Sequence, residues 1–177
     1  MSDRSAFQLK SLGGLLLLIG ALGACSERPW FAFTPADRTF HASFPFEPTK
    51  SMRTVTTAMG ESDVTFYTAT DGQIAYSVTV GEYSAEQIAR VGPAAFLDEA
   101  RNGAVANTHG KMTSEKSFDL KGNPGREVAI SVSGGKSSFR CRLILVGNRL
   151  FQVIVAGPSD EADGRSARRF LESFSLS

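Results

Sequence analysis

Hydrophobic and polar residues alternate with a period of two through most of the chain after residue 38. This period predicts β-strands, because successive side chains of a strand point to opposite faces of a sheet. In one clear example Tyr76 and Val78 share one face, whereas Ser77 and Thr79 share the other. The predicted strands are residues 39–44, 52–58, 62–70, 73–81, 113–120, 126–133, 136–146 and 149–156.

Turn signals separate these predicted strands. They are Asp71-Gly72, Gly122-Asn123-Pro124-Gly125, Gly134-Gly135 and Gly147-Asn148. Such residues suit tight turns, because Gly, Asn and Asp tolerate positive φ angles. Since short hairpins join neighbouring antiparallel strands, we expect the sheet to be antiparallel.

Two segments have the helical period instead. Ser84 and Gln87 have the spacing of a capping box. Gly92-Pro93 interrupts or restarts this helix, which continues over residues 94–107. Ser159 is predicted to cap a last helix, whose apolar face is made of Ala162, Ala167, Phe170, Leu171 and Phe174. The order ββββ-α-ββββ-α predicts one α+β domain, a single antiparallel sheet covered by helices.

The first 25 residues have the pattern of an export signal. Arg4 and Lys10 precede an apolar run over residues 12–22. As a helix this run is about 16 Å long, too short to cross a hydrocarbon core of roughly 30 Å. It has the length of a signal-peptide apolar region. The following Leu22-Gly23-Ala24-Cys25 resembles the lipobox of bacterial lipoproteins.

This resemblance implies cleavage before Cys25 and lipidation of its thiol. It divides the chain into a signal peptide (1–24), a lipidated tether (25–37) and the α+β domain (38–177). The alternative is an ordinary secretory signal with Cys25 present by chance. In lipoproteins of enteric bacteria, Asp directly after the lipidated Cys is the usual signal for retention in the inner membrane. Ser26 stands at this position, which favours an anchor in the outer membrane, facing the periplasm. The tether aromatics, Trp30, Phe31 and Phe33, are expected either at the lipid interface or packed on the domain.

The mature segment resembles the PsbP-like proteins, named for the extrinsic photosystem II protein. The resemblance covers about residues 38–176 and depends on element order and on four short motifs. The motifs are Phe44-Pro45-Phe46, Gly122-Asn123-Pro124-Gly125-Arg126-Glu127, Val146-Gly147-Asn148-Arg149-Leu150-Phe151 and Arg169-Phe170-Leu171. It implies a non-enzymatic accessory or assembly protein, by analogy of fold.

Charge and cysteine content limit the possible partners. The 177 residues include 19 basic and 18 acidic side chains, and residues after 24 include 17 of each. A neutral domain gives no electrostatic reason to expect nucleic acid. Once Cys25 carries lipid, Cys141 has no intramolecular disulfide partner. Because Cys141 alternates with Phe139 and Leu143, a buried small hydrophobe is favoured over a reactive thiol.

Catalytic patterns are weak. His41 and His109 lack the spacing of a metal site, so no metal or cofactor is expected. Ser137 or Ser138 with either histidine is a conceivable hydrolase pair, but no Gly-x-Ser-x-Gly elbow is present. Gly134-Gly135-Lys136-Ser137 matches only the end of a phosphate loop, and a hairpin turn explains it better.

One charged cluster remains as a candidate anion-binding or partner-binding surface. Its members are Arg126, Lys136, Arg140, Arg142 and Arg149. Arg140 and Arg142 are expected to project together from the sheet, towards anionic headgroups or an acidic protein. The alternative is a solvated face balanced by Glu127 and the helix acids.

Three functional hypotheses follow. The first is a non-catalytic envelope lipoprotein, anchored to the membrane through Cys25, that binds or helps to assemble another envelope protein. The second is a carrier or sensor that holds a small apolar or anionic ligand between sheet and helix, for which a deep Phe-lined cavity is the expected sign. The third is a cryptic hydrolase, which requires a histidine, an acid and a nucleophile within hydrogen-bond reach.

Overall fold

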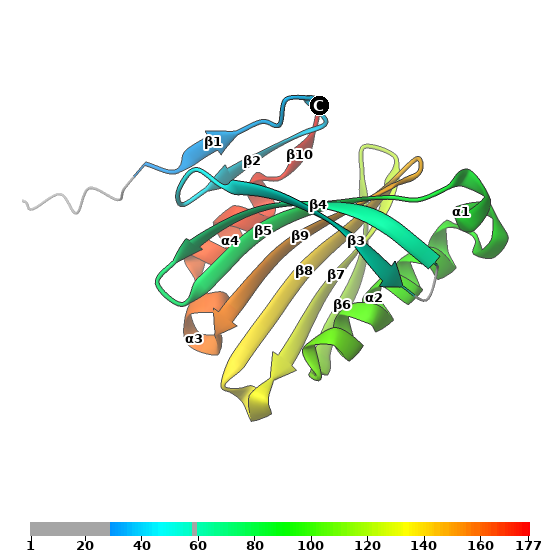
Figure 1. Ribbon diagram of the computed structural model, residues 1–177. Coiled ribbons are helices and arrows are strands. Elements are labelled where there is room, and N and C mark those ends of the chain that lie inside the picture. The colour runs from blue at the N-terminus through cyan, green and yellow to red at the C-terminus, as the bar shows by residue number, and fades with distance from the viewer. Residues whose placement is uncertain (1–28, 58–59) are drawn as a thin grey trace, which may run out of the picture.

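The computed structural model describes residues 29–57 and 60–177, so the lipobox and the predicted signal peptide lie outside the described residues. A seven-stranded sheet, antiparallel throughout, forms its centre (Figure 1). The strand order is β3 (Thr49–Thr57), β4 (Gly60–Asp71), β5 (Ile74–Glu82), β9 (Arg149–Pro158), β8 (Ser137–Val146), β7 (Asn123–Val132) and β6 (Lys111–Leu120). The predicted α+β class and antiparallel sheet are confirmed.

The first predicted strand, however, does not join this sheet. β2 (Phe40–Phe44) pairs with β1 (Phe31–Phe33) and β10 (Ser175–Leu176) in a separate three-stranded sheet. The reason is burial, because Phe40, Ala42 and Phe44 all point to one side and pack against the large sheet. A strand placed at the edge of the large sheet would bury this apolar face less completely.

The helices begin and end at the predicted signals, with one exception. Ser84 and Gln87 form the predicted capping box at α1 (Ala85–Val91). Gly92, with a φ of 85°, separates α1 from α2 (Pro93–Thr108). The predicted last helix is two helices, α3 (Ser159–Ala162) and α4 (Arg165–Ser173), because the chain breaks at Gly164 between them. The predicted serine cap is wrong, since Ser159 is the first residue of α3 and Pro158 is its N-cap. In the part of the chain that is described, no helix has the length and apolar character needed to span a membrane.

One predicted turn is displaced. Leu120 pairs with Asn123, so the turn between β6 and β7 is Lys121-Gly122, and both turn residues have positive φ. Asn123, Pro124 and Gly125 belong to β7 and were wrongly predicted as turn residues. The Gly134-Gly135 turn is confirmed as part of a short 3₁₀ turn, η1 (Ser133–Gly135).

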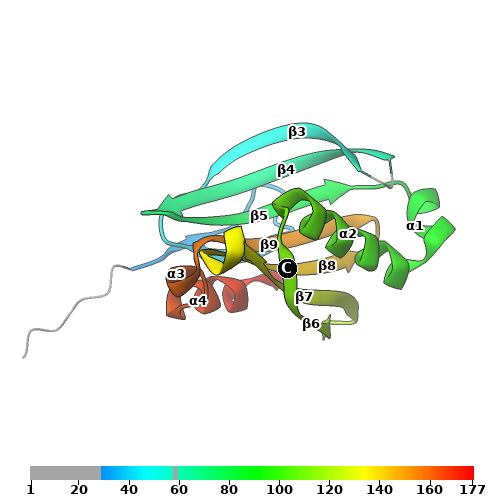
Figure 2. The same ribbon diagram turned by 90° about the horizontal axis from the view of Figure 1, so that it is seen from below.

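The two faces of the large sheet are covered by different elements. On one face, named the α4 face, lie α3, α4 and the small sheet, and the buried core includes Phe44, Tyr76 and Phe170. On the other, the α2 face, α1 and α2 cover a smaller core that includes Phe96, Val128 and Leu143. In Figure 2, α2 lies between β3 and β4 above and β6 and β7 below. The strongest helix contacts on this face are those of α2 with β7 and β8.

Candidate functional site: a cleft between α2 and the sheet

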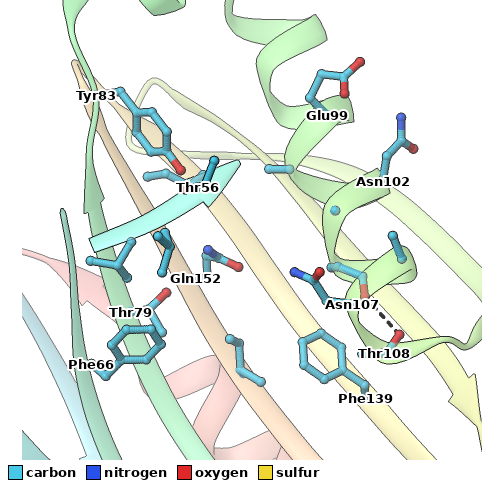
Figure 3. Close-up of a pocket in the computed structure, with 18 residues that line it drawn as sticks. Thr56, Phe66, Thr79, Tyr83, Glu99, Asn102, Asn107, Thr108, Phe139 and Gln152 are labelled. Atoms are coloured by element: carbon cyan, nitrogen blue, oxygen red, sulfur yellow. Dashed lines mark hydrogen bonds between the residues drawn. The ribbon is translucent and has the colours of Figure 1, made fainter. Parts of the chain in front are cut away.

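A cleft of about 730 Å³ opens between α2 and the half of the sheet that α2 does not cover (Figure 3). This volume lies within the range of pockets that hold drug-sized molecules. Strands β3, β4, β5, β8 and β9 form its floor and walls, and α2 forms one rim. The cleft exists because α2 packs over β7 and β8, which leaves β3 to β5 on this face without a helix.

Apolar side chains dominate the floor. Phe66 of β4 and Phe139 of β8 lie on opposite sides of the cavity in Figure 3. The other apolar lining residues of the sheet and of the segment after β5 are Val55, Val64, Tyr83, Leu150 and Ile154. Two of the lining residues are phenylalanines, so the cleft matches the deep Phe-lined cavity expected for a carrier only in part.

The polar lining residues are almost all uncharged. Exposed Asn102 and Asn107 lie on the α2 rim, and Gln152 lies on the floor. Glu99 is the one acidic residue of the lining, and no Lys, Arg or His among the described residues contributes to it. Tyr83 is buried, and this desolvation raises the pKa of its phenol, so the group stays neutral at physiological pH.

Thr79 is the most unusual residue of the cleft. Its side chain is 2% exposed, and its Oγ1 finds no hydrogen-bond partner among the described residues. Gln152 is its neighbour across the β5–β9 pair, and both side chains face the cleft. A buried hydroxyl without a partner costs about 1–3 kcal/mol, so such a group calls for an explanation.

Small residues on α2 keep the cleft open. Ala100, Gly103 and Ala104 line it from the helix side. A Cβ atom added at Gly103 would meet no atom within 4 Å. Packing therefore does not require Gly there, although Gly inside a helix costs about 1 kcal/mol relative to Ala.

The predicted basic cluster is divided between the two faces. Arg126 lies on the α2 face, where its Nε is 3.4 Å from carboxylate oxygens of both Asp98 and Glu115. Arg149, at the start of β9, is 3.1 Å from Glu82. Lys136 is exposed and follows the η1 turn.

Arg140 and Arg142 project together on the α4 face, as expected. Both lie within 4 Å of Glu127, and Arg140 also approaches Asp163 at 3.6 Å. Arg142 donates a hydrogen bond of 3.0 Å to the carbonyl of Leu171, and its guanidinium lies 4.4 Å from the ring centre of Phe118. Each of the four arginines therefore has a carboxylate partner, which favours the balanced-face interpretation.

The candidate hydrolase residues lie apart in separate interactions. His41 is on β2, where its ring nitrogens contact the hydroxyls of Thr34 at 2.7 Å and Ser177 at 3.2 Å. His109 ends α2 in a left-handed conformation. Ser138 donates to Asp163. Within residues 29–57 and 60–177, neither histidine contacts Ser137 or Ser138, and no group of three metal-ligating side chains is found.

Two further expectations depend on burial. Cys141 is fully buried, and burial raises the pKa of its thiol, as the small-hydrophobe interpretation requires.

In the predicted tether, Trp30 and Phe33 pack against the α4-face core, whereas Phe31 is 39% exposed. The tether segment therefore contacts the domain from Trp30 onward.

Sequence reasoning did not identify the cleft residues as a site. The alternation in residues 73–81 correctly assigned Thr79 to the face opposite Tyr76 and Val78. Nothing in that pattern shows whether the hydroxyl finds a partner, because partners come from distant segments. The available signal was the pair of small residues Gly103-Ala104 in the predicted helix 94–107, which follows the large apolar residues Phe96 and Leu97.

Comparisons with known proteins concern the fold. No family model and no curated protein matches the chain. The solution structure of the cyanobacterial PsbP protein, CyanoP, from Synechocystis sp. PCC 6803 has 11% sequence identity and a TM-score of 0.56, and the match covers 90% of this chain and 99% of that one. A protein of unknown function from Pseudomonas aeruginosa has 8% identity and a TM-score of 0.41, with 76% and 87% coverage. The likeness to CyanoP shows that this domain has a PsbP-like fold.

Proposed function

We propose that this chain is a non-catalytic, lipid-anchored accessory protein of a bacterial envelope that acts by binding a small molecule in the cleft beside α2. The observation that carries the proposal is the cleft itself. It is large enough for a ligand and mostly apolar. The PsbP-like fold supports an accessory role by analogy, since many members of that family are not enzymes.

The cleft favours the carrier or sensor hypothesis over docking through the basic cluster. Arg126, Arg140, Arg142 and Arg149 all have carboxylates within 4 Å. An acidic partner would have to displace these carboxylates to reach the guanidinium groups. A ligand in the cleft would not have to displace any of these carboxylates, so we assign binding to the cleft. In this proposal an envelope protein delivers the ligand to the cleft or receives it from there.

The membrane anchor is the second part of the proposal. The lipobox resemblance at Leu22-Gly23-Ala24-Cys25 supports cleavage before Cys25 and a lipid-anchored N-terminus. Two or more acyl chains bind a bilayer firmly, since each buried CH₂ adds about 0.8 kcal/mol. Ser26 after the cysteine supports the outer membrane over the inner membrane.

Mass spectrometry of the full-length gene product from separated membrane fractions tests both parts. We expect an N-terminus at Cys25 with added lipid mass in the outer-membrane fraction, and no such species for Cys25→Ala. Native mass spectrometry of the same preparation should show a non-covalent small molecule on the wild type that Gly103→Leu lacks. An unlipidated N-terminus would overturn the anchor, and identical spectra for wild type and Gly103→Leu would overturn the cleft.

A further inference from the structure

The chain enters the domain on the α4 face. The ring of Trp30 packs nearly perpendicular to that of Tyr76, with 5.7 Å between the ring centres. The guanidinium of Arg169, on α4, lies 4.7 Å from the centre of the Trp30 ring. In Figure 1, β1 and α4 lie at the same end of the large sheet, and α1 lies at the other end. Trp30 therefore marks where an anchor on the preceding residues is joined to the domain.

The length of chain before Trp30 limits how far the domain can move from the bilayer. Trp30 follows Cys25, the predicted lipidated residue, by five positions. A fully extended residue spans at most about 3.6 Å, so Trp30 lies within about 18 Å of an anchor at Cys25. Packed layers of secondary structure lie about 10 Å apart, so the outer surface of α2, beyond the large sheet, lies near or past this limit. The α4 face is therefore the face that a lipidated Cys25 holds near the bilayer.

The outer side of α4 carries a charge that suits an anionic bilayer. Four exposed residues at helical spacing form this side, which we name the α4 stripe: Arg165, Arg168, Arg169 and Glu172. The opposite side of the helix is buried in the core through Ala167, Phe170 and Leu171, so the stripe points away from the sheet. Three of its four residues are arginines, and guanidinium groups bind phosphate oxygens through paired hydrogen bonds. Each arginine near an anionic surface favours the contact by about fivefold.

Exposed aromatic rings lie where the chain enters the domain. Phe31 and Phe46 are each 39% exposed, whereas Phe40 and Phe44 of β2 are fully buried. Phe31 is the partner of Phe44 across the β1–β2 pair, and Phe46 follows Phe44 by two residues. Both exposed rings therefore lie at the end of the small sheet next to Trp30. Aromatic side chains beside arginines are typical of surfaces that rest at the boundary between headgroups and acyl chains.

We propose that the α4 stripe and these aromatic rings rest on anionic phospholipid headgroups, so that the cleft beside α2 opens away from the bilayer. The inference rests on the lipid anchor of the proposed function and adds which face the anchored domain presents to the membrane. In this orientation the cleft exchanges its ligand on the aqueous side, with another protein, and not directly with the lipid phase.

Nitroxide labels on the two helices test this orientation in the full-length, lipidated chain. Glu172→Cys places a label on α4 and Glu99→Cys places one on α2, and both variants lose one exposed carboxylate. Cys141 is fully buried, and unsubstituted protein treated with the same reagent measures any background labelling. We compare nanodiscs of phosphatidylcholine alone with nanodiscs that also contain phosphatidylglycerol. The anionic lipid should lower the accessibility of the label at position 172 to a water-soluble nickel chelate by about threefold or more, and leave position 99 unchanged.

A charge reversal tests the contribution of the stripe itself. In the Glu172→Cys chain, Arg168→Glu should restore most of the accessibility at position 172 in the anionic nanodiscs. Arg90→Glu, at the exposed end of α1, is the matched control and should leave the protection unchanged. High salt should weaken the protection as well, because salt screens exposed charges. Melting temperatures measured in parallel establish that each variant is folded.

The outcomes separate this orientation from the proposed function. Equal protection at positions 172 and 99, or protection at position 99 alone, overturns the orientation. Protection at position 172 that does not depend on phosphatidylglycerol or on Arg168 overturns the anionic headgroups as the partner. A mass spectrum of the same sample reports the anchor: a lipidated N-terminus with an accessible label at position 172 means that only the orientation is wrong. An unlipidated N-terminus overturns the anchor, and the orientation with it.

Discussion

On the α4 face of the sheet, aromatic rings fill the space between the large sheet, the small sheet and α4. The rings of Phe44 and Tyr76 lie 4.9 and 5.3 Å from that of Phe170. On the α2 face, the corresponding helix presents Ala100, Gly103 and Ala104 to the sheet, and a cavity remains. Both faces belong to the same strands, so the difference arises from the covering elements. One face provides stability, and the other retains space at some cost in stability.

The largest expected loss of stability comes from removing an aromatic ring from the core on the α4 face. Phe170 is fully buried, and Phe170→Ala should lower the free energy of unfolding by about 3–5 kcal/mol. Phe139→Ala on the cleft wall is the control, because this side chain is already partly exposed and its loss should cost less than about 2 kcal/mol. Urea titration, followed by the fluorescence of the single Trp30, measures both. Equal losses would mean that the two faces do not differ as described.

A smaller loss of stability should distinguish the partly buried Arg142 from the more exposed Arg149. Arg142→Ala removes the hydrogen bond to Leu171 and the contact with Phe118, and should cost about 2–3 kcal/mol. Arg149→Ala breaks an exposed ion pair with Glu82 and should change stability by less than about 0.5 kcal/mol. Thermal unfolding in low and high salt measures both. If Arg142→Ala is neutral, that guanidinium is free for an anion and the basic cluster returns as a candidate site.

On the floor of the cleft, a substitution is expected to raise the free energy of unfolding instead of lowering it. Thr79→Val removes a buried hydroxyl that has no described partner, and should raise the ligand-free stability by about 1 kcal/mol. Ser77 lies on the same strand and face, but its hydroxyl contacts that of Thr68 at 2.9 Å. Ser77→Ala should therefore lower stability by about 1 kcal/mol. Urea titration of ligand-depleted protein measures the pair, and a loss in Thr79→Val would show that its hydroxyl is already satisfied.

Sequence patterns predicted local structure better than they predicted what covers the sheet. The capping box of Ser84 and Gln87 and the alternation of Tyr76 and Val78 are local, and both are confirmed. β1 and β10 contain three and two residues, too few to show a period, and both form by pairing with β2, which is far from β10 in the sequence. Likewise, alternation assigned Thr79 to a face, but it could not show that α2 leaves that part of the face open.

The smallest expected effect concerns the helix side of the cleft. Gly103→Ala should raise the free energy of unfolding by about 0.5–1 kcal/mol, because the new methyl group enters open space and Ala favours the helix. Gly110, just after the same helix, is the contrasting position. A Cβ atom there would lie 2.5 Å from Ile130 and 2.7 Å from the carbonyl oxygen of Ser131, so Gly110→Ala should be destabilising. Calorimetry can resolve both changes. A stability gain at position 103 without a change in fold would show that packing between α2 and the sheet does not require Gly there, in contrast to position 110.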